Sequence, residues 1–192
     1  MQTTTNHKEL AHHDAHISSE CYSDRAEISG EDFARAFRQY PGGVAVITAD
    51  SPDGPVALTA TSVVSVSAAP PLLAFSISHR ASTAASIRSA HSYVVHFLGK
   101  DQLEIAQLCA TSGVDRFADT RLWARLPTGE PYFPSAPAWV AGTRIDQLDA
   151  GAASIILLRA TQSKVTPGAD GTPPLVYFNR GWHHLGEHSQ VS

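Results

Sequence analysis

The amino-acid sequence predicts a mainly β fold, in which a β-barrel carries a few short helices. Six or so segments are rich in β-branched and aliphatic residues, which is typical of strands. Clusters of Gly and Pro separate them, as at 50–55 and 166–174. The helical patterns are short and do not alternate regularly with the strands, so a doubly wound parallel sheet is disfavoured. A length of 192 residues suits one domain.

The first ordered element is expected to be a short helix that begins near Ser29. Phe33, Phe37 and Tyr40 follow at spacings of three and four, which places them on one face. Ser29 or Asp32 is expected to cap this helix, and the Pro41 to Gly43 run ends it. Two more helices are expected at 82–90 and 101–110, and the stretch 111–137 reads as irregular. Strands are expected at 44–48, 56–67, 72–77, 93–98, 138–146, 153–161 and 175–178.

The composition divides the chain and excludes several classes of protein. Residues 1–28 are polar and are expected to be a flexible extension, 29–186 the domain, and 187–192 a tail. The net charge is −4, so no nucleic-acid partner is expected. No apolar run is long enough to cross a membrane, and the start has no signal-peptide core, so a cytoplasmic location is expected. Cys21 and Cys109 match no disulfide or metal spacing, so no metal site is expected.

A row of hydroxyl side chains marks the most informative segment. Thr59, Thr61, Ser65 and Ser67 share one parity, and Ser62 lies between them. In a regular strand the four would point to one face, where they could hydrogen-bond a flat polar ring system or a phosphate. The same pattern also describes the wet side of a half-exposed strand.

A second candidate segment follows one strand later. Arg80 has a guanidinium fork suited to phosphate, and Ser82 and Thr83 open a predicted helix whose first amides favour anions. Alternatively, one hydroxyl is simply the helix cap and Arg80 a surface charge. No nucleophile motif, P-loop or dinucleotide fingerprint occurs, and the internal histidines lack metal spacing. An enzyme of this kind would therefore need a cofactor for the chemical step.

Several segments, in order along the chain, resemble the flavin reductase-like, FMN-binding split-barrel family. They are the runs 37–48, 59–71, 93–98, 102–106, 116–117, 136–139 and 174–177, and the similarity covers about 30–185. The resemblance implies a six-stranded Greek-key split barrel that forms a homodimer.

The resemblance also implies an activity, in which NADH or NADPH reduces FMN or FAD and the reduced flavin serves a partner monooxygenase. Such pairs act in bacterial aromatic degradation and antibiotic biosynthesis. By similarity, Arg80, Ser82 and Thr83 would lie at the flavin phosphate. The ring and ribityl chain would meet Thr59, Thr61, Ser62, Ser65, Val66 and Ser67.

The chain departs from the family pattern in three segments. Ala152 and Ala153 stand where the family often has Asp-His, and that histidine is associated with the nicotinamide side of the site. Gly42 replaces a threonine near the flavin, and His96 replaces an asparagine, which makes His96 the one histidine that we retain as a catalytic candidate. The alternative hypothesis is a split-barrel protein without hydride transfer, which binds flavin for a partner or acts on a biosynthetic intermediate. A related oxidase or F420-type reductase and a non-catalytic dimerisation module are further alternatives.

Overall fold

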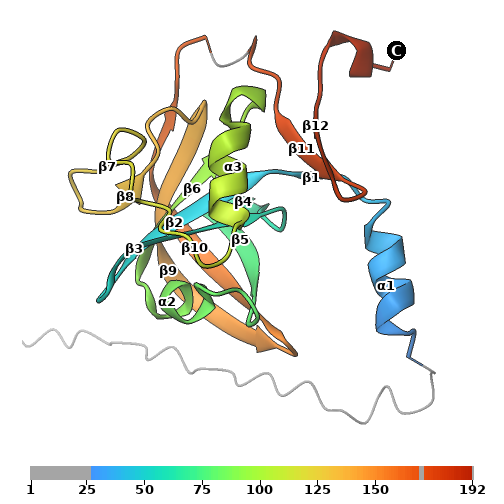
Figure 1. Cartoon of the computed structure of the whole chain (residues 1–192). Coiled ribbons are helices and arrows are strands. Elements are labelled where there is room, and N and C mark those ends of the chain that lie inside the picture. Colours follow the sequence, from blue (N-terminus) through green and yellow to red (C-terminus); the bar gives the residue numbers. More distant parts are fainter. Residues whose placement is uncertain (1–26, 169–170, 192) are drawn as a thin grey trace, which may run out of the picture.

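The computed structural model describes residues 27–168 and 171–191. The predicted extension at 1–28 lies almost wholly outside this part of the chain. The described part is mainly β, as predicted, and Figure 1 shows its sheets with three helices around them. The helices are α1 (Gly30–Phe37), α2 (Ala84–Ser89) and α3 (Leu103–Ala110), with short 3₁₀ turns at Lys100–Gln102 and Glu187–Ser189.

One large antiparallel sheet organises the fold. Its strand order is β3-β2-β6-β9-β10-β5-β4, so β2 lies beside β6 and β5 lies beside β10, although neither pair is consecutive in the chain. A small sheet, β1-β11-β12, and a hairpin, β7-β8, complete the structure. The strands are β1 (Gly42–Gly43), β2 (Ala45–Ser51), β3 (Gly54–Ala60), β4 (Val64–Ala68), β5 (Pro71–Ser78), β6 (Ser92–Phe97), β7 (Ala124–Arg125), β8 (Pro131–Tyr132), β9 (Ala138–Ala150), β10 (Ala153–Val165), β11 (Leu175–Phe178) and β12 (Gly181–His184).

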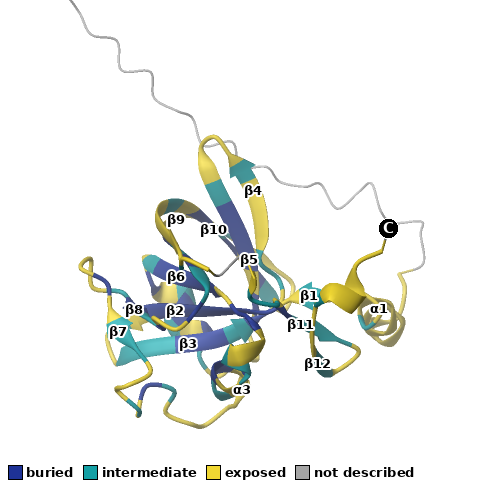
Figure 2. Cartoon of the chain, turned by 90° about the horizontal axis from the view of Figure 1, so that it is seen from above, coloured by how far each residue is buried: buried dark blue, intermediate teal, exposed yellow. Residues whose placement is uncertain are grey.

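Strand β2 is buried on both faces and separates two parts of the core. Ala45 and Ile47 face a cluster that includes Ile87 of α2, whereas Val46 faces a second cluster that includes Ile105 of α3. Figure 2 shows this strand in dark blue at the centre of the molecule. Helices α2 and α3 therefore cover opposite faces of the sheet.

The predicted strand at 56–67 is wrong in one respect, because it is two strands. β3 ends at Ala60, β4 begins at Val64, and residues 61–63 form no ladder. The two strands lie at opposite ends of the sheet order, so the chain leaves one edge and joins the other. The single-face argument for Thr59, Thr61, Ser65 and Ser67 required a continuous strand and fails here.

Helix α1 forms as predicted, but its apolar face is uncovered. Ser29 caps it by accepting a hydrogen bond from the Asp32 amide at 3.0 Å. Phe33, Phe37 and Tyr40 are 52%, 58% and 71% exposed, although their rings pack on one another. Figure 1 shows α1 beside the main body and away from the large sheet. Among the described residues, no helix is both long and apolar enough to span a membrane.

Candidate functional site

The break at residues 61–63 is held open by a serine. Where Ser62 would pair with Ser76 of β5, its hydroxyl instead bonds both backbone groups of Ser76, donating to the carbonyl at 2.9 Å and accepting from the amide at 3.1 Å. These two bonds replace the missing ladder bonds. The backbone at 61–63 is thereby free to turn toward the small β1-β11-β12 sheet.

A glycine allows that sheet to approach. A β-carbon on Gly42 would lie 2.8 Å from Thr61 Cβ and 3.2 Å from the Thr61 carbonyl oxygen. No side chain fits there without a shift of the backbone. The family has a threonine at the position of Gly42, and this chain has no room for that side chain. Thr61 lies directly against the β1 backbone instead.

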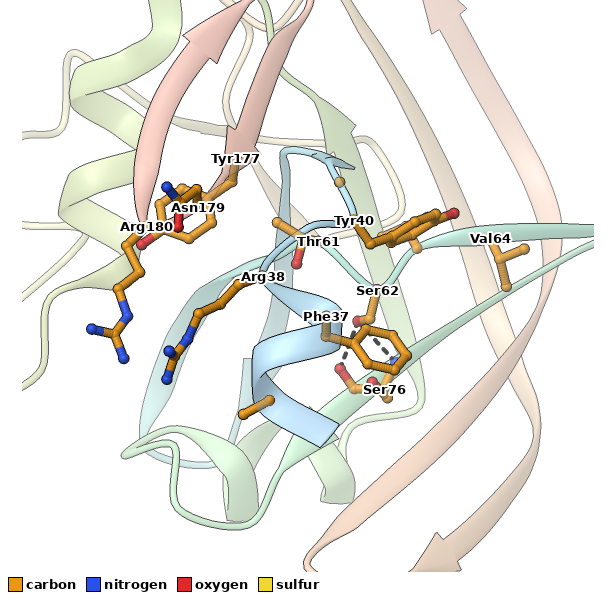
Figure 3. A pocket seen from close by; sticks show the side chains of 13 residues that line it. Phe37, Arg38, Tyr40, Thr61, Ser62, Val64, Ser76, Tyr177, Asn179 and Arg180 are labelled. Carbon is orange, nitrogen blue, oxygen red and sulfur yellow. Dashed lines mark hydrogen bonds between the residues drawn. The ribbon is translucent and has the colours of Figure 1, made fainter. Parts of the chain in front are cut away.

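A cavity of about 720 Å³ opens at this junction. Figure 3 shows its walls: the end of α1, the 61–64 segment with Ser76, and the turn that carries Asn179 and Arg180. The lining combines aromatic rings, hydroxyls and two guanidinium groups, and it contains no Asp or Glu. Its residues are Ala34, Phe37, Arg38, Tyr40, Gly42, Thr61, Ser62, Val63, Val64, Ser76, Tyr177, Asn179 and Arg180.

The structure separates the six predicted ring and ribityl contacts. Only Thr61 and Ser62 line this cavity. Thr59 donates to the Ala106 carbonyl at 2.7 Å and so ties β3 to α3, although it also lines a smaller hollow with Thr61. Ser65 and Ser67 line a separate groove, because the strand break turns them elsewhere. Val66 lies between them on β4 and is 51% exposed.

The second predicted segment gains a residue that sequence reasoning missed. Arg80 and Ser82 are exposed, and Thr83 begins α2 without a capping hydrogen bond from its side chain. The guanidinium of Arg116 lies 3.5 Å from the Ser82 hydroxyl. Arg116 is fixed by bonds to the carbonyls of Cys109 in the last turn of α3, at 3.2 Å, and of Thr111 at the C-cap, at 2.7 Å. The run 116–117 belongs to the resemblance noted above, but no signal in the sequence relates 116 to 82, because only the folded path of the loop after α3 brings Arg116 to the start of α2.

Arg80 and Arg116 both lack a carboxylate partner within 4.0 Å in the described part of the chain. Near the start of α2, the chain thus has two arginines without a carboxylate partner and the two hydroxyls of Ser82 and Thr83. This donor set fits a phosphate group, which accepts charge-assisted hydrogen bonds. The aromatic and hydroxyl lining of the cavity in turn fits a flat, polar ring system.

The catalytic candidate His96 proves to be a core residue. It is fully buried, and both ring nitrogens are occupied: Nδ1 donates to the Val46 carbonyl at 2.9 Å, and Nε2 accepts from the Phe133 amide at 3.0 Å. Burial lowers its pKa from 6.5 to about 4. Because the ring is fully buried and neither nitrogen is available to a ligand, His96 is a structural residue and not a catalytic one.

Ala153 begins β10 beside Ser78 of β5. The imidazole of His79 bonds the next residue of β10, because its Nε2 lies 2.8 Å from the Ser154 hydroxyl. Ser154 donates in turn to Asp149 at 2.6 Å, and this bond holds the pKa of Asp149 below its usual range. Because neighbouring side chains of a strand face opposite sides, His79 bonds on the face away from Ala153. It does not stand in for the absent histidine.

Together, the large antiparallel sheet and this cavity define a β-barrel-type protein with a cavity whose lining fits a flat, polar ring system. The chain belongs to the flavin reductase family, because residues 37–186 match the model of the flavin reductase like domain. This confirms the resemblance read from the sequence.

Named relatives agree with this assignment. A NADH:FMN oxidoreductase of Rhodococcus qingshengii is 46% identical over 121 residues, 63% of this chain and 62% of that protein. The match thus spans less than two thirds of that relative. A NADH:riboflavin 5'-phosphate oxidoreductase of Streptomyces pristinaespiralis is 34% identical over 160 residues, 83% of this chain and 90% of that protein. The solved structure of BorF, the flavin reductase component of a bacterial two-component tryptophan halogenase, matches with a TM-score of 0.72 and 29% identity, over 83% and 99% of the chains.

Proposed function

We propose that this protein is an NAD(P)H:flavin oxidoreductase that supplies reduced flavin to a partner monooxygenase. The observation that carries the proposal is the cavity at the β3-β4 break, with hydroxyls and aromatic rings but no acid, in a chain of the flavin reductase family. The reductases named among the relatives support it. Bound FMN or FAD would supply the redox chemistry, as a carrier of the electrons of a hydride.

The chain's own residues bind and orient. We assign the ring to Thr61 and Ser62 at the cavity, and the phosphate to Arg80, Ser82 and Thr83, with Arg116 added. The Thr61 hydroxyl makes no hydrogen bond within the described residues, so it is free for a ligand. The Ser62 hydroxyl, in contrast, is already hydrogen-bonded to the Ser76 backbone, and it fixes the backbone at the strand break. The rate of hydride transfer then depends mainly on positioning, because two rings must stack at near-contact distance.

Purified protein mixed with FMN or FAD tests the activity when NADH or NADPH is added under air. We expect nicotinamide absorbance to fall well above the rate of free flavin alone. No such fall, with both flavins and both nucleotides, would refute the reductase assignment.

Thr61→Val should weaken FMN binding about three- to tenfold, as lost fluorescence quenching reports. Thr120→Val, on an exposed loop, is the matched control.

Ala152 and Ala153 favour a second candidate function. A flavin-binding protein without hydride transfer would keep the cavity and lack the histidine on the nicotinamide side. Such a protein would bind FMN yet leave NADH unoxidised. Ala153→His separates the two: under the second candidate this variant should gain NADH oxidation, whereas under the first it should change the rate little.

The uncovered face of α1 supports a homodimer. Three aromatic side chains, Phe33, Phe37 and Tyr40, lie exposed side by side, and exposed apolar clusters mark interaction sites. Sedimentation of the wild type is expected to give twice the mass of one chain. The Phe37→Ser variant should give a mass closer to that of a single chain. A partner monooxygenase and a cytoplasmic location complete the proposal.

A further inference from the structure

Two arginines reach the cavity from elements far apart in the sequence. Arg38 caps the end of α1, where its backbone amide bonds the Ala34 carbonyl. Arg180 lies in the turn between β11 and β12. Figure 3 shows both guanidinium groups on the same side of the cavity and pointing in the same direction. Neither residue belongs to the flavin contacts assigned above.

The turn that carries Arg180 is unusual for its sequence. Asn179 and Arg180 both have positive φ, at 46° and 63°, while Phe178 pairs with Gly181 across the hairpin. Two-residue turns of this kind favour Asn and Gly, and arginine at the second position is disfavoured by its β-carbon. The turn nonetheless holds Arg180 at the cavity wall, which suggests a use for its charge.

The charges of both arginines are uncompensated. Arg35, Arg88, Arg121 and Arg125 each pair with an aspartate, but in the described part of the chain no carboxylate lies within 4.0 Å of Arg38 or Arg180. The cavity lining likewise contains no acid. In a chain of net charge −4, two unpaired cations at one cavity indicate an anionic ligand with more than one charge.

We propose that Arg38 and Arg180 bind the diphosphate of the nicotinamide dinucleotide. This inference rests on the proposed function. The flavin phosphate already has candidates at Ser82 and Arg116, so a second pair of cations is left for a second nucleotide. The nicotinamide must stack on the ring beside Thr61, and Arg38 and Arg180 line the same cavity as Thr61. Guanidinium forks suit the paired oxygens of a diphosphate.

FAD carries the same diphosphate chemistry, so the test needs separate arms. ADP-ribose, which has the diphosphate and no nicotinamide, is titrated calorimetrically into the FMN-loaded protein. FAD and FMN are titrated into the flavin-free protein. The variants are Arg38→Gln, Arg180→Gln and Arg180→Gly, the last because glycine suits the positive φ and preserves the turn. Arg35→Gln on the same helix and Arg159→Gln on β10 are controls, since neither lines the cavity.

We expect ADP-ribose to bind about three- to tenfold more weakly to each variant, as loss of one exposed charge-assisted contact allows. The KM for NADH should rise with little change in kcat, and the controls should match the wild type. High salt should weaken ADP-ribose binding to the wild type more than to an Arg38/Arg180 double variant.

Three results would overturn the inference: no ADP-ribose binding by the wild type, equal binding by wild type and variants, or a loss confined to FAD. The last would assign the diphosphate to the flavin. A failure of the proposed function looks different, because NADH would then go unoxidised while ADP-ribose binding still depended on Arg38 and Arg180.

Discussion

Acidification should destabilise this fold through one buried histidine. His96 is neutral in the folded chain, with a pKa of about 4, because burial disfavours its charged form. In the unfolded chain its pKa returns to 6.5. Between these values the unfolded state binds a proton that the folded state does not, so stability is full above pH 6.5 and falls toward pH 4. At about 1.4 kcal/mol per pKa unit, the loss contributed by His96 approaches about 3 kcal/mol.

Urea unfolding at several pH values between 7 and 4 measures this loss. His96→Gln removes the titrating group while keeping one hydrogen-bonding amide. It should be less stable at pH 7 by about 1–3 kcal/mol, since one buried bond is lost, yet fall less steeply with acid. His91→Gln, at an exposed position, should follow the wild-type curve. Equal slopes for wild type and His96→Gln would refute the reasoning, because the acid loss would then arise elsewhere.

Three further predictions concern the strand break and the core. Gly42→Ala should destabilise the fold by about 1–3 kcal/mol and weaken FMN binding, because its methyl would lie 2.8 Å from the β-carbon of the threonine it faces; Gly43→Ala, with open space around it, should do neither. Ser62→Ala should cost about 1–3 kcal/mol in chemical denaturation through two lost backbone contacts, and the exposed Ser65→Ala should cost little. A variant with Cys109 as its only cysteine should react with a thiol reagent only after denaturation, since burial raises its pKa to about 12.

The sequence predicts the elements of this fold better than their ends. The strand expected at 175–178 appears with those bounds, and the helix at 101–110 divides into a 3₁₀ turn and α3. The spacing of apolar residues indicates which face of a segment is buried, but it does not show which distant segment packs there. The small β1-β11-β12 sheet was not predicted, because its first strand is only Gly42–Gly43 and forms by pairing with a distant segment.

The candidate site was predicted only in part, for the same physical reason. Alternation of side chains is a valid rule within one strand, so it could not show that 61–63 breaks the ladder. That break depends on Ser62 bonding Ser76 and on Gly42 meeting Thr61. Both contacts join segments that no local pattern connects. Arg116 and Arg180 were missed likewise, since a lone arginine carries no sign of what packs beside it.

The structure shows what surrounds Ala153, the position at which the family often has a histidine. Ala153 faces away from the Ser154, His79 and Asp149 cluster, so the imidazole of His79 is not positioned to replace a histidine there. If binding energy for the nicotinamide dinucleotide comes instead from Arg38 and Arg180, loss of one ring contact need not abolish hydride transfer. Ala153→His and the two arginine variants therefore test the same question, which is whether NADH binding depends on the arginines or on a histidine at position 153. A reductase that relies on the arginines should lose NADH affinity with them and gain little from the restored histidine.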